Sequence, residues 1–197
     1  MAFILASGSQ TRADMLTNAG VAFEVDPARV DEDAVKTALV ADGAPPRDIA
    51  DALADLKARA VAMRRPEDMV MGADQILVCD GKIFSKADTR EEAAETLKAL
   101  SGKSHQLLSA AVVYEGGQPI WRTVDTVKLS VRPLSDAFIE GYLDAIGDAA
   151  LWSVGAYQIE GRGAQLFTKV EGDHFTVLGL PLFALLDFLR RRGMMPL

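Results

Sequence analysis

Residues 69–86 read Met-Val-Met-Gly-Ala-Asp-Gln-Ile-Leu-Val-Cys-Asp-Gly-Lys-Ile-Phe-Ser-Lys, and this stretch decides the fold. Two apolar runs, Met69–Met71 and Ile76–Cys79, are separated by Gly72-Ala73-Asp74-Gln75. A carboxylate rarely lies at the centre of a buried strand, because removing it from water costs several kcal/mol unless it is paired. The small residues before Asp74 also allow backbone or ligand to come close. We therefore expect Asp74 to have a special partner or a function.

Asp80-Gly81, directly after the second apolar run, is a strong signal for a two-residue β-hairpin. The hairpin would return Lys82–Phe84 alongside the preceding strand and bring Lys86 back toward Asp74. Two interpretations of this acid and base remain open. They form a structural ion pair, or they act together on a ligand at the end of a sheet.

The composition indicates that the folded chain can bury a substantial apolar core. It has 197 residues, of which 49% are apolar, enough for one domain of good size or two small lobes. We expect a single domain over residues 1–197. The net charge of −7 and the pI near 4.9 argue against a protein that coats nucleic acid. The one cysteine, Cys79, excludes an internal disulfide framework and is expected to be a buried apolar side chain.

The hydropathy pattern predicts no membrane segment. No run of about 18 apolar residues is present, so we expect no membrane span. The N-terminus lacks a basic region followed by a long apolar segment, so no signal peptide is predicted. A cytoplasmic location is the expectation that follows.

The N-terminus predicts an anion site. A short strand at Phe3–Ala6 is followed by the polar turn Ser7–Gln10 and by a helix over Thr11–Ala19. Free backbone N–H groups and the helix dipole both attract anions at such a helix N-terminus. Arg12 lies in the first helical turn, where a cation is mildly unfavourable for the helix itself. Either Arg12 serves an anionic ligand, or it is an ordinary solvated arginine.

Two further segments carry charges of interest. Val30-Asp31-Glu32-Asp33 is either a solvated loop or half of a metal site with Asp74, since hard divalent cations prefer carboxylate oxygens. Pro46–Arg64 is an amphipathic helix whose apolar stripe contains Lys57. A lysine there either extends its ammonium group to the edge of the buried face or contacts a phosphate in a cleft.

The remaining segments alternate between helical and strand patterns, which predicts a mixed α/β sheet. A Gly-rich irregular loop, Trp152–Gly163, suggests a binding loop. The other expected elements are a strand at Phe23–Val25, a helix from a capping box at Thr89 to Gly102, strands at Ser104–Tyr114 and Trp121–Val131, a helix at Ser135–Ile146, a strand at Gln165–Val170, and a final helix from Gly179 to Arg192.

The charged residues named above are of the types that bind a polyphosphate together with a divalent metal. A carboxylate and a metal can activate water, while lysine and arginine neutralise phosphoryl oxygens. The candidates are Arg12, Lys57, Lys86, Glu32 and Asp74. The chain has only two histidines, and it contains neither a Walker loop nor a Gly-x-Gly-x-x-Gly fingerprint. A Ser-His-Asp hydrolase, a P-loop ATPase and a Rossmann dehydrogenase are therefore disfavoured.

Several short motifs follow one another in an order that resembles the Maf family of nucleotide pyrophosphatases. The first, Leu5-Ala6-Ser7-Gly8-Ser9-Gln10-Thr11-Arg12, resembles the opening Leu-Ala-Ser-x-Ser-Pro-x-Arg of that family. The others are Val30-Asp31-Glu32, Leu56-Lys57-Ala58, Gly72-Ala73-Asp74-Gln75, Lys86, Ser101-Gly102-Lys103-Ser104-His105, Gly155-Ala156-Tyr157 and Gly179-Leu180-Pro181. The resemblance runs nearly from end to end.

This resemblance implies hydrolysis of a nucleoside triphosphate between its α and β phosphates, giving a monophosphate and pyrophosphate. It implies a mixed twisted central sheet flanked by helices, with two lobes and an active-site cleft between them, the Maf or ITPase-like fold. It also implies a divalent metal, Mg²⁺ or Mn²⁺, and a homodimer. The residues matched are Asp74 as general base, Ser7, Ser9, Arg12, Lys57 and Lys86 as phosphate ligands, and Glu32 with Asp74 as metal ligands.

Three positions relate to the choice of base. Gln75 and Glu160 resemble the branch of the family that acts on 7-methyl-GTP, whereas Ala156-Tyr157 resembles the thymidine and uridine branch and Thr11 matches neither well. A glutamate can accept hydrogen bonds from a guanine-like base, and its charge favours a cationic methylated purine. The hypothesis is a house-cleaning enzyme for modified nucleotides.

A non-catalytic alternative uses the same residues. A nucleotide-binding regulator of cell division and septum formation would bind phosphate through the same groups without cleaving it. The appearance of product distinguishes the two.

Overall fold

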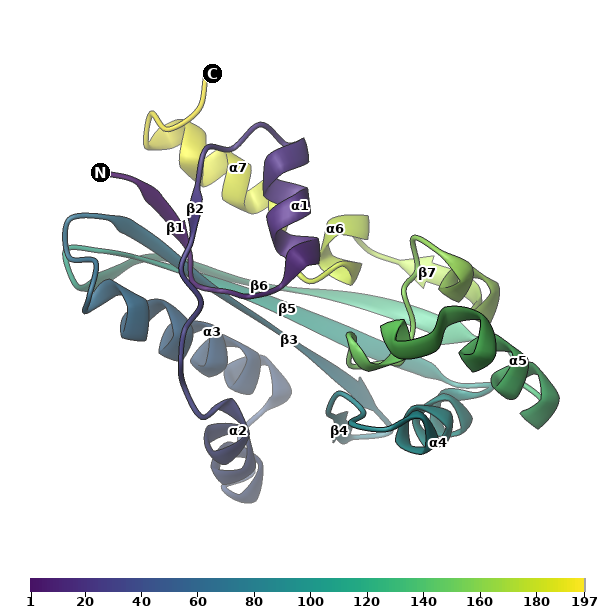
Figure 1. The fold of residues 1–197 in the computed structure, drawn as a ribbon. Coiled ribbons are helices and arrows are strands. Elements are labelled where there is room, and N and C mark those ends of the chain that lie inside the picture. The colour runs from purple at the N-terminus through teal and green to yellow at the C-terminus, as the bar shows by residue number, and fades with distance from the viewer. Residues whose placement is uncertain (197) are drawn as a thin grey trace. The chain divides into compact units, whose positions relative to one another are not determined.

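The computed structural model describes residues 1–196 and has a mixed α/β fold. A seven-stranded sheet has the order β2-β1-β3-β5-β6-β7, with β4 paired to β3 (Figure 1). Strand β1 pairs in parallel with β2 and β3, whereas the β3–β4 and β6–β7 pairs are antiparallel. The predicted mixed central sheet flanked by helices is confirmed.

The bounds of the elements agree with most of the predicted segments. The strands are β1 (Phe3–Leu5), β2 (Glu24–Val25), β3 (Met69–Cys79), β4 (Lys82–Phe84), β5 (Ser104–Glu115), β6 (Gln118–Val131) and β7 (Phe167–Glu171). The helices are α1 (Gln10–Asn18), α2 (Glu32–Ala41), α3 (Pro46–Ala62), α4 (Arg90–Leu100), α5 (Asp136–Ile146), α6 (His174–Val177) and α7 (Leu182–Arg191). Two 3-10 helices, η1 (Gly147–Leu151) and η2 (Arg162–Leu166), lie in the segment between α5 and β7.

The chain divides into two compact units. Unit 1 comprises Met1–Gln75, Leu108–Asp125 and the residues from His174 onward. Unit 2 comprises Ile76–Leu107 and Thr126–Asp173. Asp74 and Gln75 are thus the last residues of β3 that belong to unit 1.

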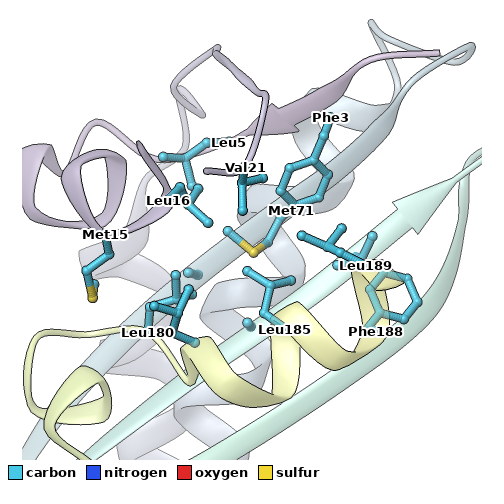
Figure 2. Close-up of a cluster of buried hydrophobic side chains, with 14 of the residues drawn as sticks. Phe3, Leu5, Met15, Leu16, Val21, Met71, Leu180, Leu185, Phe188 and Leu189 are labelled. Atoms are coloured by element: carbon cyan, nitrogen blue, oxygen red, sulfur yellow. The ribbon is translucent and has the colours of Figure 1, made fainter. Parts of the chain in front are cut away.

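A buried apolar cluster in unit 1 holds α1 and α7 against strands β1 and β3 (Figure 2). Phe3 and Leu5 of β1 and Met71 of β3 meet Leu16 of α1 and Leu185 of α7, and each of these side chains is at most 2% exposed. Leu180, just before α7, is also fully buried in this cluster. The cluster therefore fixes both the turn that follows β1 and the segment that enters α7.

Helix α3 lies on the other side of β3 and approaches it closely at Gly72. A Cβ atom at Gly72 would lie 2.2 Å from the Ala54 carbonyl oxygen and 2.4 Å from the Ala58 nitrogen. Only a residue without a side chain fits at this distance, so the helix backbone packs directly on the strand. This contact brings Lys57, the residue before Ala58, next to the strand that carries Asp74.

Strand β3 is continuous through Gly72–Gln75, whereas the sequence predicted two runs separated there. Small residues lie against α3, and the carboxylate of Asp74 is paired, so neither forces the strand to break. The predicted hairpin is confirmed: Cys79 pairs with Lys82, and both Asp80 and Gly81 have positive φ angles, 49° and 76°. A two-residue turn of type I′ needs this combination.

Helix α2 was not predicted. Asp31 is its N-cap, since its side chain accepts a hydrogen bond from the Ala34 nitrogen at 3.0 Å, and Glu32 and Asp33 form an acidic first turn. The segment 30–33 is therefore the start of a helix and not a loop, although Asp31 and Asp33 are exposed as expected of solvated side chains. None of the ten residues of α2 is buried, although Val35 and Leu39 lie four residues apart on the side that faces α3.

Candidate active site

One ammonium group joins two carboxylates at the centre of the candidate site. Nζ of Lys57 in α3 lies 2.8 Å from Oδ1 of Asp74 in β3 and 2.7 Å from Oε2 of Glu32 in α2. The Lys57 and Asp74 side chains are 9% and 11% exposed, and that of Glu32 is 43% exposed. The ion pairs are thus buried on one side and open on the side of Glu32. The ammonium thus extends to the partly open edge beside Glu32, and its contact with a phosphate stays a prediction.

A buried guanidinium group belongs to the same charged cluster. Burial lowers the pKa of Arg12, and the charges of Asp74 and Glu32 raise it. Its Nε donates to the Gly179 carbonyl at 2.8 Å, and its Nη1 donates to Ser7 Oγ at 3.1 Å. Both of these partners are neutral, and among residues 1–196 no carboxylate is bonded to this buried charge. Such a charge favours the arrival of an anion.

The turn between β1 and α1 shapes the space next to this arginine. Ser9 is the N-cap of α1, and its Oγ accepts from the Arg12 nitrogen at 3.4 Å. Ser7 Oγ also accepts from the Ser9 nitrogen at 3.3 Å. The first turn of α1 therefore begins beside Arg12, so a helix N-terminus and a buried cation lie together where the sequence predicted an anion site. Thr11 lies in this first turn and is partly buried.

Gln75, which follows Asp74, is engaged within unit 1. Its Nε2 lies 3.0 Å from Ser109 Oγ, from the Thr176 carbonyl oxygen and from the Val177 carbonyl oxygen. This arrangement could not be predicted from local sequence, because the three partners lie more than thirty positions away along the chain.

Lys86 and Glu160 belong to unit 2. Their approach to Asp74 therefore remains a prediction. Glu160 is exposed and lies near Tyr142, whose pKa is raised to about 12, first by burial and also by the charge of Glu160.

Two motifs that are separate in sequence meet inside unit 2. His105 Nε2 lies 2.6 Å from the hydroxyl oxygen of Tyr157. Burial lowers the pKa of His105 to about 4, so the imidazole is neutral at pH 7, and its Nδ1 atom has no hydrogen-bond partner within the described part of the chain. Sequence reasoning placed both residues in motifs but missed their contact, for which only a tertiary structure gives a signal.

The loop before Tyr157 has an unusual backbone. Ala156 has a positive φ angle of 56°, which costs a non-glycine residue about 1 kcal/mol or more. Ser153 Oγ donates to the Tyr157 carbonyl oxygen at 2.6 Å and accepts from the Tyr157 nitrogen at 3.1 Å. The serine side chain therefore clamps both ends of the strained turn.

The donor set fits a magnesium or manganese ion. Glu32 and Asp74 each place an oxygen within 2.8 Å of a single Nζ atom, so both carboxylates face the same position. Across residues 1–196 no group of three or more His, Cys, Asp or Glu side chains could hold a metal by itself. Mg²⁺ is commonly bound by one or two carboxylates together with water and substrate phosphates. The residues present suit that mode.

An open hollow of about 480 Å³ lies elsewhere in unit 1, between α2, α3 and β6. Of the two arginines that line it, Arg59 and Arg122, the second donates to Asp51 at 2.6 Å and to Asp55 at 3.0 Å. None of the predicted site residues lines this hollow.

Comparison with known proteins identifies close relatives along the whole chain. A family model described as Maf-like protein matches residues 2–192. The nucleoside triphosphate pyrophosphatase of Ruegeria pomeroyi is 53% identical over 190 residues, which are 96% of each chain. The nucleoside triphosphate pyrophosphatase of Caulobacter vibrioides is 54% identical over 96% of this chain and 94% of its own. The 7-methyl-GTP pyrophosphatase of Rhizobium meliloti is 48% identical over 96% of each chain.

Proposed function

This chain belongs to the Maf family, and from that membership we propose that it is a nucleoside triphosphate pyrophosphatase, a hydrolase acting on acid anhydrides. The observation that carries the proposal is the Lys57 ammonium between two carboxylates, next to the buried charge of Arg12. Relatives named for this activity at about half identity support it. No helix among residues 1–196 is long and apolar enough to cross a membrane.

The proposed reaction uses Asp74 as general base. The triphosphate lies along Ser7, Ser9 and Arg12, with the charge of Lys57 on its oxygens. Water attacks the α phosphorus, Asp74 takes the proton, and the bond from that phosphorus to the bridging oxygen breaks to release pyrophosphate. Cations held in place by the fold stabilise the charge that develops on the phosphoryl oxygens. Lys86 is assigned to the same phosphates, as the resemblance implies.

Glu32 and Asp74 are the residues that would hold a divalent metal in this proposal. Bound Mg²⁺ or Mn²⁺ would supply Lewis-acid chemistry at the phosphoryl oxygens. The partial exposure of Glu32 leaves that side of the carboxylate pair open to an entering cation. The ammonium of Lys57 must then move onto the phosphate oxygens.

We further propose 7-methyl-GTP as a preferred substrate. One relative, from Rhizobium meliloti, is named for this nucleotide, and the exposed carboxylate of Glu160 suits a base that carries positive charge. The substitution Glu160→Gln keeps the shape and removes the charge. It should lower the preference for 7-methyl-GTP over GTP by about tenfold, since one hydrogen-bonded charge contributes about 1.5 to 3 kcal/mol. An unchanged ratio would remove Glu160 from base selection.

A homodimer and a cytoplasmic location are part of the proposal. The free, buried Cys79 fits a reducing compartment. Light scattering should give about twice the 21.2 kDa mass of one chain.

Pyrophosphate release tests the central proposal. The panel contains 7-methyl-GTP, GTP, UTP, TTP and CTP with Mg²⁺ or Mn²⁺, each assayed with the wild type and with Asp74→Asn. We expect the variant to lose about 10²- to 10⁴-fold in kcat, as for removal of a general base. Asp42→Asn, on an exposed residue at the end of α2, is the matched control and should keep full activity. Nucleotide binding without any release would instead support the cell-division regulator.

A further inference from the structure

An arginine just beyond the end of α3 holds the segment of chain that leads to Glu32. Arg64 donates from Nε to Asp26 Oδ2 at 3.2 Å and from Nη2 to Asp26 Oδ1 at 2.6 Å. The same Nη2 donates to the Pro27 carbonyl oxygen at 3.0 Å, and Nη1 donates to the Ala60 carbonyl oxygen of α3 at 3.4 Å. Because a guanidinium group is planar and rigid, two bonds to one carboxylate fix the direction of the segment as well as its distance.

The same part of the segment also lies against β1 and the turn that follows it. The Asp26 nitrogen donates to the Leu5 carbonyl oxygen at 3.1 Å, and Val25 pairs with Leu5 in the sheet. A Cβ atom at Gly8 would lie 3.9 Å from the Pro27 Cβ atom. Arg64 therefore ties the end of α3 to a point where the chain contacts the predicted phosphate-binding turn.

The other end of the segment is Glu32, the first residue of α2. Residues 26–31 have no regular structure and connect β2 to α2 (Figure 1). No residue of α2 is buried, so the core does not fix the place of Glu32. Nζ of Lys57 lies 2.7 Å from Glu32 Oε2. Two side chains of one helical region, Arg64 and Lys57, thus hold the segment at its two ends.

These two contacts differ in what the proposed reaction does to them. The ammonium of Lys57 moves onto the phosphate oxygens, so its bond to Glu32 is lost when the nucleotide binds. The partners of Arg64 are Asp26 and Pro27, neither of which is assigned to the nucleotide. The contacts of Arg64 therefore persist at the stage when Glu32 must hold a metal.

We propose that Arg64 is a positioning residue for Glu32, holding residues 26–31 on α3 so that the carboxylate keeps facing Asp74 after Lys57 has left. The inference rests on the proposed function, in which Glu32 and Asp74 hold a divalent cation. Positioning and simple electrostatics predict opposite signs. Removing a positive charge strengthens the binding of a cation through space, whereas loosening the segment weakens it.

The affinity for Mn²⁺, measured by electron paramagnetic resonance of the free ion, tests the proposal without turnover. We expect Arg64→Gln to bind Mn²⁺ about tenfold more weakly, the lower end of the range for groups that orient metal ligands. The loss should be larger in a Lys57→Met background, where the second contact is already gone. In a Glu32→Gln background the same substitution should change the affinity by less than about twofold, because the ligand that it positions is absent.

Two further variants separate geometry from charge. Arg65→Gln removes the same charge from the next residue, whose partners are Glu24 and Asp68, and should leave the Mn²⁺ affinity within about twofold. Asp26→Asn removes a charge of the opposite sign and should still reproduce most of the Arg64→Gln loss, since it breaks the same pair. Unchanged or tighter Mn²⁺ binding by Arg64→Gln would overturn the proposal, as would an equal loss in the Glu32→Gln background.

Pyrophosphate release by the wild type is measured separately, so failure of the proposed function is distinguishable from failure of this inference. Coupling of Arg64 to Glu32 in Mn²⁺ binding, without any release, would support the positioning role and refute the enzyme. Release together with a Mn²⁺ affinity that does not depend on Arg64 would support the enzyme and refute the positioning role. Mn²⁺ binding that is independent of Glu32 would overturn both the metal assignment and this inference.

Discussion

Lys57 Nζ lies 2.8 Å from Asp74 Oδ1, within a cluster where the same ammonium also reaches Glu32. The ammonium occupies the space between the two oxygens that would hold a divalent cation. Metal binding and lysine pairing therefore compete for the same carboxylates. In the absence of nucleotide, the single charge of Lys57 offsets part of the charge of these two carboxylates.

Removal of Lys57 should strengthen metal binding in the absence of nucleotide. In Lys57→Met the two carboxylates face each other without a cation, so we expect Mn²⁺ to bind about tenfold tighter, equal to about 1.4 kcal/mol. Electron paramagnetic resonance of free Mn²⁺ measures this without any turnover. Lys36→Met removes the same charge from an exposed pair with Asp33 and is the matched control. Equal or weaker binding by Lys57→Met would show that lysine and metal do not compete.

Gly72 should tolerate no side chain. In Gly72→Ala the new methyl group would overlap the backbone of α3 at Ala54 and Ala58, so helix and strand must separate. We expect a loss of about 3 kcal/mol in the free energy of unfolding, measured by urea denaturation. Gly141→Ala is the control, because nothing lies within 4 Å of its Cβ position in α5. That variant should gain about 0.5 to 1 kcal/mol from helix propensity.

Acid should destabilise the protein through His105. Its pKa is lowered from 6.5 to about 4 in the folded state, so between these values the unfolded chain binds a proton that the folded chain does not. Stability from this group is present above pH 6.5 and is lost as the pH falls toward 4, by up to about 3 kcal/mol. Urea titrations of wild type and His105→Gln at several pH values measure the difference in slope. Parallel slopes would contradict a buried neutral imidazole.

The clamp at Ser153 should matter for stability. Ser153→Ala leaves both the nitrogen and the carbonyl of Tyr157 without the hydroxyl that pairs with them. We expect a loss of about 1 to 3 kcal/mol, as for buried polar groups left unpaired. Ser104→Ala is the comparison, since its hydroxyl makes an exposed contact with Ser130 and its loss should cost less than about 0.5 kcal/mol. Equal losses would mean that solvent replaces the clamp.

The sequence predicted the fold class and most elements because these depend on local signals. Apolar periodicity located α3, capping residues located α4 and α5, and Asp80-Gly81 located the hairpin. Helix α2 was missed although its N-cap Asp31 and its acidic first turn are local start signals, and none of its residues is buried.

The residues of the candidate site could be predicted from the sequence, but the ion pairs that they form could not. A carboxylate in a buried strand and a lysine in an apolar stripe each cost free energy when they are unpaired. This cost is why Asp74 and Lys57 were predicted to have a partner or a function. Their pairing depends on how closely α3 packs on β3, which Gly72 permits and no local pattern encodes. For the same reason Lys86 was expected near Asp74, whereas the cation bonded to Asp74 in unit 1 is Lys57.

Because α2 is exposed, its sequence can diverge within the family with little effect on folding. Glu32 is the first residue of a helix that contributes nothing to the buried core, so substitutions in the rest of that helix carry little folding cost. Selection on the site then acts on a single position within a stretch that is otherwise free to drift. Among relatives of this chain, α2 should be among the most divergent helices, with an acid retained at its first residue.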